Sequence, residues 1–212
     1  MELIESAKKF LWLKKAITDS AQLREGVLQA YSEAATDPHG KHPFPVGRWF
    51  AESIGYPAGI LDSLPALAAE TFTGVSNVAV FAKIPEGSTV LDIGCGAGLD
   101  TFIASQKTGV SGRVIGIDFS EPMIQKARGA ASKVNLNNIE FFCAAAEKLP
   151  ISNESVDVIL VNGIFNLNPF RDHVFRELAR VIKTGGSVYA AELVLKKPQR
   201  AKKVYKVDDW FS

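Results

Sequence analysis

Residues 90–100 read VLDIGCGAGLD: an apolar run, a carboxylate and three glycines spaced two apart. Val90 to Ile93 have the character of a buried strand, and the glycines leave little side chain where that strand would pass into a helix. Glycine in such a turn lets a ligand lie close to the backbone. The stretch therefore predicts a strand, a ligand-binding loop and a helix, in that order.

Apolar runs alternate with amphipathic stretches along the rest of the chain. Runs such as VDVILV (156–161) are apolar on both faces, as in a sheet that helices cover on both sides. The expected fold is therefore α/β, a doubly wound, mainly parallel, Rossmann-like sheet. Strands are expected at 88–93, 113–118, 139–143, 156–162 and 187–194, and helices at 98–108, 121–133 and 171–182.

The segment before Ile84-Pro85 has a different pattern, with apolar residues at helical spacing. One helix is expected between Leu3 and Ile17 and a second from Leu23 to Tyr31, with Ser20 as its cap. Shorter helices are expected around 48–54 and 65–72. We therefore predict a helical annex over 1–84, a ligand-binding domain over 85–195 and a basic tail over 196–212.

The composition excludes several classes of protein. A net charge of +1 gives no general reason to expect nucleic acid or an anionic membrane as a partner. The two cysteines, Cys95 and Cys143, form no CxxC pair, which argues against a disulfide scaffold or a zinc site and for a reducing compartment. No run reaches the roughly 18 apolar residues of a membrane span. We expect a cytoplasmic protein with no metal, no nucleic acid and no membrane partner.

Two classes of nucleotide-like ligand fit a glycine-rich strand exit. The dinucleotide fingerprint is G-x-G-x-x-G, whereas Gly94, Gly96 and Gly98 form G-x-G-x-G. Asp92 beside the loop is a poor neighbour for a pyrophosphate and a tolerable one for a cationic ligand. Asp118 follows the second strand, where an acid can bind a ribose diol in either class. The spacing disfavours a nicotinamide-dependent oxidoreductase, which remains an alternative.

Two later segments, CAAAEKLPI (143–151) and VDVILVNGIFNL (156–167), complete an ordered set of motifs. With them, residues 88–195 resemble the class I S-adenosylmethionine-dependent methyltransferases. The resemblance implies S-adenosylmethionine as cofactor and S-adenosylhomocysteine as product. It assigns cofactor binding to Asp92, Gly94, Cys95, Gly96, Gly98, Asp118, Phe119, Met123, Ala146, Glu147 and Asn162.

The resemblance also implies which part of the cofactor each group contacts. The glycine loop would surround the methionine and ribose moieties, and Asp118 would take the ribose hydroxyls. Phe119 and Met123 would lie near the adenine, with Ala146 and Glu147 at its edge, while Asn162 would close the methionine side. One departure is Ala145, where many relatives carry an Asp that accepts from the adenine amino group.

A narrower resemblance concerns the acceptor. ETFTGVSN (70–77) and the stretch 161–186 look like the arsenite methyltransferase-like branch, which binds trivalent arsenic through cysteine thiolates. At the matching positions this chain has Val75 and Gly163, and Cys143 matches neither. We therefore expect a small organic acceptor rather than arsenite, bound in a thiol-free pocket near these two residues.

The annex is expected to supply acceptor contacts, as in many such enzymes. Its candidates are Tyr31, His39, His42, Phe44, Arg48 and Trp49, and His39 or His42 could act as a base. The NPF stretch at 168–170 is interpreted as a loop and helix start. His173 is interpreted as a surface residue.

The C-terminus raises a further alternative. Methyltransferases of this class usually end with an antiparallel pair of strands, and the 17 residues after Leu195 are too few for both. Either this chain is a truncated form, or another subunit completes the edge as a homodimer. With Ala145, the short C-terminus favours the alternative of a non-catalytic S-adenosylmethionine-binding protein or a truncated methyltransferase domain.

Overall fold

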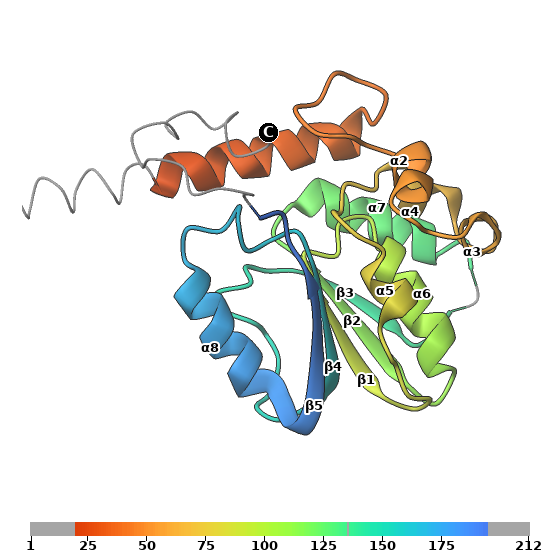
Figure 1. Cartoon of the computed structure of the whole chain (residues 1–212), viewed down its shortest axis with the longest axis vertical. Helices are drawn as coiled ribbons and strands as arrows, with labels where there is room; N and C mark the ends of the chain where they lie inside the picture. The colour runs from red at the N-terminus through yellow and green to blue at the C-terminus, as the bar shows by residue number, and fades with distance from the viewer. Residues whose placement is uncertain (1–19, 135, 195–212) are drawn as a thin grey trace, which may run out of the picture.

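The structure is a computed structural model that describes residues 20–134 and 136–194 (Figure 1). A helix over residues 20–36 comes first, and Ser20, the predicted cap, already lies within it. The expected helix between Leu3 and Ile17 and the predicted tail lie outside the described residues. The other helices are α2 (Arg48–Ser53), α3 (Ala58–Asp62), α4 (Ala66–Glu70), α5 (Val78–Phe81), α6 (Leu99–Thr108), α7 (Glu121–Ala131) and α8 (Arg171–Val181).

The five described strands form one parallel sheet in the order β3-β2-β1-β4-β5. They are β1 (Thr89–Ile93), β2 (Arg113–Asp118), β3 (Ile139–Cys143), β4 (Val156–Asn162) and β5 (Ile182–Ala191). The chain moves outward from β1 to β3 and then returns to place β4 on the other side of β1. This reversal is the switch point of a doubly wound sheet, and the predicted fold class is confirmed.

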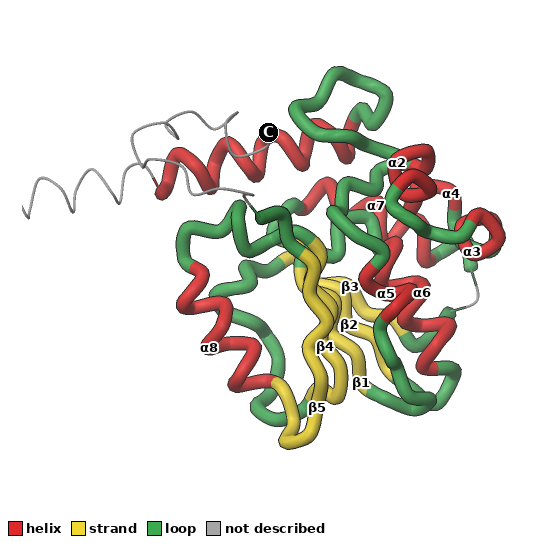
Figure 2. The backbone as a smooth tube through the Cα atoms, in the orientation of Figure 1, coloured by secondary structure: helices red, strands yellow, loops and turns green. Residues whose placement is uncertain are grey.

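Side chains of the central strands alternate between two hydrophobic clusters because successive residues of a strand point to opposite faces. Val90, Val114 and Val158 belong to the cluster beneath α5, α6 and α7, whereas Leu91, Ile115 and Ile159 belong to the cluster that α8 covers. Figures 1 and 2 show α8 on one side of the sheet and α5 and α6 on the other. Both faces are therefore buried, as the continuous apolar runs of β1 and β4 predict.

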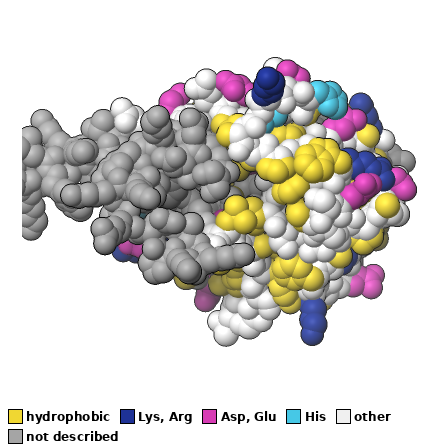
Figure 3. All heavy atoms as spheres, turned by 45° about the horizontal axis from the view of Figure 1, so that its top comes forward, with side chains coloured by type: hydrophobic (Ala, Val, Ile, Leu, Met, Phe, Trp, Pro, Cys, Tyr) yellow, Lys and Arg dark blue, Asp and Glu magenta, His cyan; other side chains and the backbone are white. Residues whose placement is uncertain are grey.

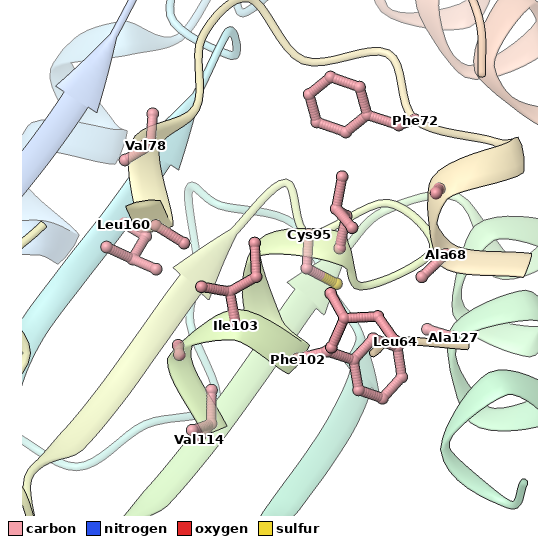
Figure 4. Close-up of a cluster of buried hydrophobic side chains, with 14 of the residues drawn as sticks. Leu64, Ala68, Phe72, Val78, Cys95, Phe102, Ile103, Val114, Ala127 and Leu160 are labelled. Carbon is pink, nitrogen blue, oxygen red and sulfur yellow. The ribbon is translucent and has the colours of Figure 1, made fainter. Parts of the chain in front are cut away.

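The annex packs against the sheet domain through a shared core. Leu64, Ala68 and Phe72 belong to the same buried cluster as Phe102 and Ile103 of α6, as Figure 4 shows. The predicted division between 84 and 85 therefore crosses a continuous apolar core, and the domain boundaries stay a prediction.

Some element boundaries differ from the expected ones. α3 and α5, of five and four residues, were not predicted, whereas the equally short α4 lies within the helix expected at 65–72. β5 begins at Ile182 rather than 187 and ends at Ala191. Its pairing with β4 shifts between Val156 and Val158, and Gly185 has φ +84° within the irregular part. Glycine permits this backbone conformation, so the strand begins earlier than the apolar pattern.

Helix 20–36 lies across the carboxyl ends of the strands (Figure 1). On the face that Figure 3 shows, hydrophobic side chains are interspersed with charged side chains of both signs. Among the helices of the described residues, none has the length and apolar character needed to cross a membrane.

Candidate functional site

The glycine loop after β1 has a backbone path that requires glycine. Gly94, Gly96 and Gly98 have φ values of 71°, 53° and 91°, in the left-handed region that other residues rarely adopt. A Cβ at Gly94 would lie 2.3 Å from Cγ2 of Ile164, so packing alone demands glycine there. A Cβ at Gly96 would meet only Sδ of Met123 at 3.9 Å. Gly96 therefore leaves open space over the backbone that a ligand can use.

A cavity opens at this loop, at the carboxyl ends of the central strands. It encloses about 1070 Å³ free of protein atoms, a volume that includes the open solvent at its mouth. Its walls come from the glycine loop, helix 20–36, the segment before α5 and the loop after β4. Among the lining residues are Asp92, Gly94, Cys95, Gly96, Asp118, Phe119, Ala146, Glu147 and Asn162.

The structure thus brings together nine of the eleven predicted cofactor residues. Gly98 and Met123 do not line the cavity. Gly98 caps α6, and Met123 is buried against Ala97 under helix 20–36. Cys95 lines the cavity, but its sulfur points into the apolar cluster beside Phe102 (Figure 4). The contact of these residues with a cofactor stays a prediction.

Asp118 ends β2 and holds the glycine loop in place. Its Oδ2 accepts from the Gly96 amide at 2.9 Å, and its Oδ1 accepts from the Ser120 amide at 2.8 Å. Burial raises the pKa of this carboxyl above its ordinary value, because the charged form loses its hydration. Asp118 therefore fixes the loop and also presents a carboxylate to the cavity.

Two further carboxylates lie at the loop end of the cavity. Asp92 is 1% exposed, and its Oδ2 accepts from the Thr101 hydroxyl at 2.5 Å. Burial, with the nearby Asp100 adding to it, raises the pKa of Asp92 to about 8. Burial also raises the pKa of Asp100. Buried carboxylates without a cationic partner are costly, so this end of the cavity favours a positively charged ligand.

Asn162 at the end of β4 lines the cavity, yet its side chain is occupied by protein groups. Its Oδ1 accepts from the amides of Val75 and Ser76 at 2.8 and 3.1 Å. Its Nδ2 donates to Oδ2 of Asp100 at 2.8 Å and to the Ser76 carbonyl at 2.7 Å. Asn162 therefore joins the segment before α5 to the sheet.

The predicted adenine side is built from the loop after β3. Phe119, Ala146 and Glu147 line the cavity there. Glu147 forms an ion pair with Arg24 of helix 20–36, with Nη1 and Oε1 3.4 Å apart. This pair connects the two sides of the cavity above the strand ends.

The annex candidates separate into two groups. Tyr31 lines the cavity and stacks on Phe44 with ring centroids 4.7 Å apart. Burial raises the pKa of Tyr31 well above its ordinary value. His39, His42, Phe44, Arg48 and Trp49 line a second hollow instead, formed mainly by the loop before α2. His173 is exposed on α8, as predicted.

Sequence reasoning missed several groups. Asp100 belongs to the quoted motif but was not singled out, because an acid in the first turn of a helix ordinarily serves its N-terminus. Tyr56 and Arg24 lie outside the motifs that the sequence analysis identified. The NPF stretch at 168–170 forms a loop that leads into α8, as predicted. Asn168 and Pro169 in this loop also line the cavity.

S-adenosylmethionine carries positive charge on its sulfonium and ammonium groups. The lining residues at the loop end include Asp92 and Asp118, and Arg24 is the one lysine or arginine among the described lining residues. Asp100 lies beside them, but its oxygens already accept from Tyr56, Ala79 and Asn162. With the open backbone at Gly96, these residues fit the cofactor that the resemblance implies.

Comparisons with known proteins agree with the methyltransferase resemblance. A family model described as a methyltransferase domain matches residues 84–210. An arsenite methyltransferase of Halobacterium salinarum is 39% identical over 70% of this chain and 38% of its own length. A demethylmenaquinone methyltransferase of Lactococcus lactis is 39% identical over 50% of this chain and 42% of its own length. The chain thus spans about two fifths of these curated relatives.

Among solved structures, an arsenic(III) S-adenosylmethionine methyltransferase of Chlamydomonas reinhardtii aligns with a TM-score of 0.53 and 26% identity. The alignment covers 69% of this chain and 48% of that one. The family model, the relatives and the shared fold lead to one conclusion: the chain belongs to the class I S-adenosylmethionine-dependent methyltransferases and is related to their arsenite methyltransferase branch.

Proposed function

We propose that the chain transfers a methyl group from S-adenosylmethionine to a small, uncharged, largely apolar acceptor other than arsenite. The observation that carries this proposal is one cavity with two unlike ends. Buried carboxylates lie at the glycine loop, whereas Phe72, Ile164 and Leu167 supply apolar walls at the segment before α5 and the loop after β4.

The chain's residues have distinct parts in this proposal. Asp118 would hold the ribose hydroxyls, and the backbone from Gly94 to Gly98 would hold the methionine and ribose moieties. Asp92 would balance the positive charge of the ligand. The bound cofactor supplies an electrophilic methyl group, so the protein's main task is to align the acceptor. Helix 20–36 and the Arg24–Glu147 pair would help to exclude water.

The positions that replace the arsenic-binding cysteines support an acceptor other than arsenite. A Cβ at Gly163 would lie 3.0 Å from Cγ1 of Val75, so the two positions are in contact and offer no thiol. Cys95 is the one cysteine among the described residues that line the cavity. Burial, with Asp92 and Asp118 adding to it, keeps the pKa of its thiol well above the ordinary value. A protonated thiol is a poor ligand for a soft metalloid.

The walls also favour an uncharged acceptor. Arg24 is paired with Glu147, and no other lysine or arginine of the described residues lines the cavity. A carboxylate or phosphate on the acceptor would lie among the apolar walls without a compensating cation. The three histidines lie outside the lining, so an acceptor with an acidic or unprotonated nucleophile fits best.

The test is S-adenosylhomocysteine production with purified protein. We expect product with neutral aromatic thiols or phenols, less with their carboxylated analogues, and none with arsenite plus a reducing thiol. Turnover of arsenite would contradict the proposal. Cofactor binding without turnover of any acceptor would favour the alternative, a non-catalytic S-adenosylmethionine-binding protein. A homodimer also stays a prediction, which light scattering tests.

A further inference from the structure

Asp100 lies at the centre of a buried network that joins three separate segments. Its Oδ1 accepts from the Tyr56 hydroxyl at 2.7 Å and from the Ala79 amide at 3.2 Å. Its Oδ2 accepts from Nδ2 of Asn162 at 2.8 Å. The partners come from the turn after α2, from α5 and from β4, and Asp100 itself is 5% exposed. One carboxylate therefore connects α6 with the turn after α2, with α5 and with β4.

The carboxylate fixes the orientation of the Asn162 amide. An ionised carboxylate can only accept hydrogen bonds, so Asp100 selects the Nδ2 end of Asn162, together with the Ser76 carbonyl on the same side. The Oδ1 end then faces the amides of Val75 and Ser76 and accepts from both. Reversal of the amide would place its NH2 group against the two backbone N–H donors and its oxygen against the acceptor oxygens of Asp100 and Ser76. Asp100 thereby determines, through Asn162, the path of the backbone at 74–77.

This segment packs closely against Asn162. A Cβ at Gly74 would lie 2.6 Å from Nδ2 of Asn162. Phe72, Thr73 and Gly74 line the cavity, and Val75 contacts Gly163. Residues 72–75 and Gly163 form what we call the acceptor wall. Its position relative to the glycine loop depends on the Asn162–Asp100 link.

A second clamp acts on α5, which follows this segment, and it allows fold stability to be tested separately from positioning. Nζ of Lys107 donates to the carbonyls of Ala79, Val80 and Ala82 at 2.7–2.8 Å, at the end of α5. Lys107 and Asp100 are both on α6, and they hold opposite ends of α5. Because Lys107 makes no contact with Asn162 in these bonds, its removal loosens α5 without freeing the Asn162 amide.

We propose that Asp100 is a positioning residue that sets the acceptor wall through Asn162 and does not bind the cofactor itself. The inference rests on the proposed function for the meaning of the wall, but its geometry is independent of the acceptor's identity. It predicts separable effects: loss of Asp100 should disorder the wall and weaken acceptor binding while cofactor affinity is kept.

The experiment compares Asp100→Asn with Asp157→Asn. Asp157 is a matched control, since it also accepts from a backbone amide, that of Thr89 at 2.8 Å, and pairs with Lys183. Amide hydrogen exchange at Val75 and Ser76 is measured by NMR, and S-adenosylhomocysteine affinity by calorimetry. Lys107→Met is the second control, and the milder Tyr56→Phe is used if Asp100→Asn fails to fold.

In Asp100→Asn, exchange at Val75 and Ser76 should rise at least about tenfold, as expected when a hydrogen bond to a charged group is lost. Affinity for S-adenosylhomocysteine should stay within about threefold, a change of less than one such bond. With an acceptor that turns over, its KM should rise while the KM for S-adenosylmethionine holds. Both control variants should leave the exchange of these two amides unchanged.

Unchanged exchange at Val75 and Ser76 would overturn the proposal, and a loss of cofactor affinity of about tenfold or more would make Asp100 a ligand instead. If Tyr56→Phe is the variant used, a smaller rise at the same two amides is expected, and no rise overturns the proposal. Failure of the wild-type chain to bind S-adenosylhomocysteine would refute the proposed function alone, because the exchange measurement needs no cofactor.

Discussion

Lowering the pH should weaken S-adenosylmethionine binding through Asp92. This carboxyl is buried beside Asp100, Asp118 and the Cys95 thiol, and its described hydrogen bond comes from the neutral Thr101 hydroxyl. Burial beside Asp100 raises its pKa to about 8, which favours the protonated carboxyl in the apoprotein at neutral pH. A cationic ligand favours the ionised form, so binding should release a proton.

The expected size follows from that pKa. If the ligand binds the ionised form, affinity falls about tenfold for each pH unit below 8. Between pH 8.5 and pH 6 the loss is therefore roughly 80-fold. S-adenosylhomocysteine lacks the sulfonium charge and should lose less over the same range. The loss of affinity occurs as the pH falls, because protonation removes the negative charge that attracts the ligand.

Calorimetry at pH 6, 7 and 8.5 in buffers of different ionisation enthalpy measures both the affinity and the proton release. Asp92→Asn is the matched variant, and it should show weaker binding with little dependence on pH over this range. A flat affinity for the wild-type chain between pH 6 and 8.5 would refute the reasoning. So would the same pH dependence in Asp92→Asn.

Three further predictions concern the loop and the clamp on α5. Gly96→Val should abolish binding of S-adenosylhomocysteine, because a branched side chain would occupy the open space over the backbone and would strain a residue with φ 53°; wild-type affinity by calorimetry would contradict the loop's assignment. Asp118→Ala should weaken the same binding by about 1.5–3 kcal/mol, the usual range for hydrogen bonds to charged groups, and unchanged affinity would leave Asp118 only its contact with the loop. Lys107→Met should lower the free energy of unfolding by about 1–3 kcal/mol in urea titrations, since three carbonyls lose their donor; an unchanged midpoint would mean that α5 is held without it.

The stability of the apoprotein gives an independent check on Asp92. Its folded pKa is raised, so the folded state keeps a proton that the unfolded state has lost. The contribution of Asp92 to stability should therefore fall as the pH rises from about 4 to about 8. Asp92→Asn should reduce this slope in urea titrations at several pH values. An identical slope in the variant would argue against the raised pKa.

The sheet was predictable because its signals are local. Runs such as VDVILV are apolar on both faces, and the glycine loop marks the end of β1 unambiguously. α5 was not predictable, because its four residues are stabilised by Asp100 and Lys107, which lie more than twenty positions later in the chain. Short helices held by distant side chains leave no periodic pattern to detect.

The same reason explains which site residues were missed. Asp118 and the glycines belong to motifs whose spacing reports their role. Asp100, which was missed, accepts from the predicted residue Asn162, and Asn162 in turn binds Val75 and Ser76. Only the packing of α5 against α6 and β4 brings these groups together. His39 and His42 were considered as a base because of their residue type, and the loop before α2 places them around a second hollow. A role of either as a base stays a prediction.

The central claim is that the glycine loop and its carboxylates hold S-adenosylmethionine. The most direct test is calorimetric titration of the purified chain with S-adenosylmethionine, S-adenosylhomocysteine and NADH. We predict micromolar binding of the first two and none of NADH. Binding of NADH alone, or of none of the three, would contradict the claim.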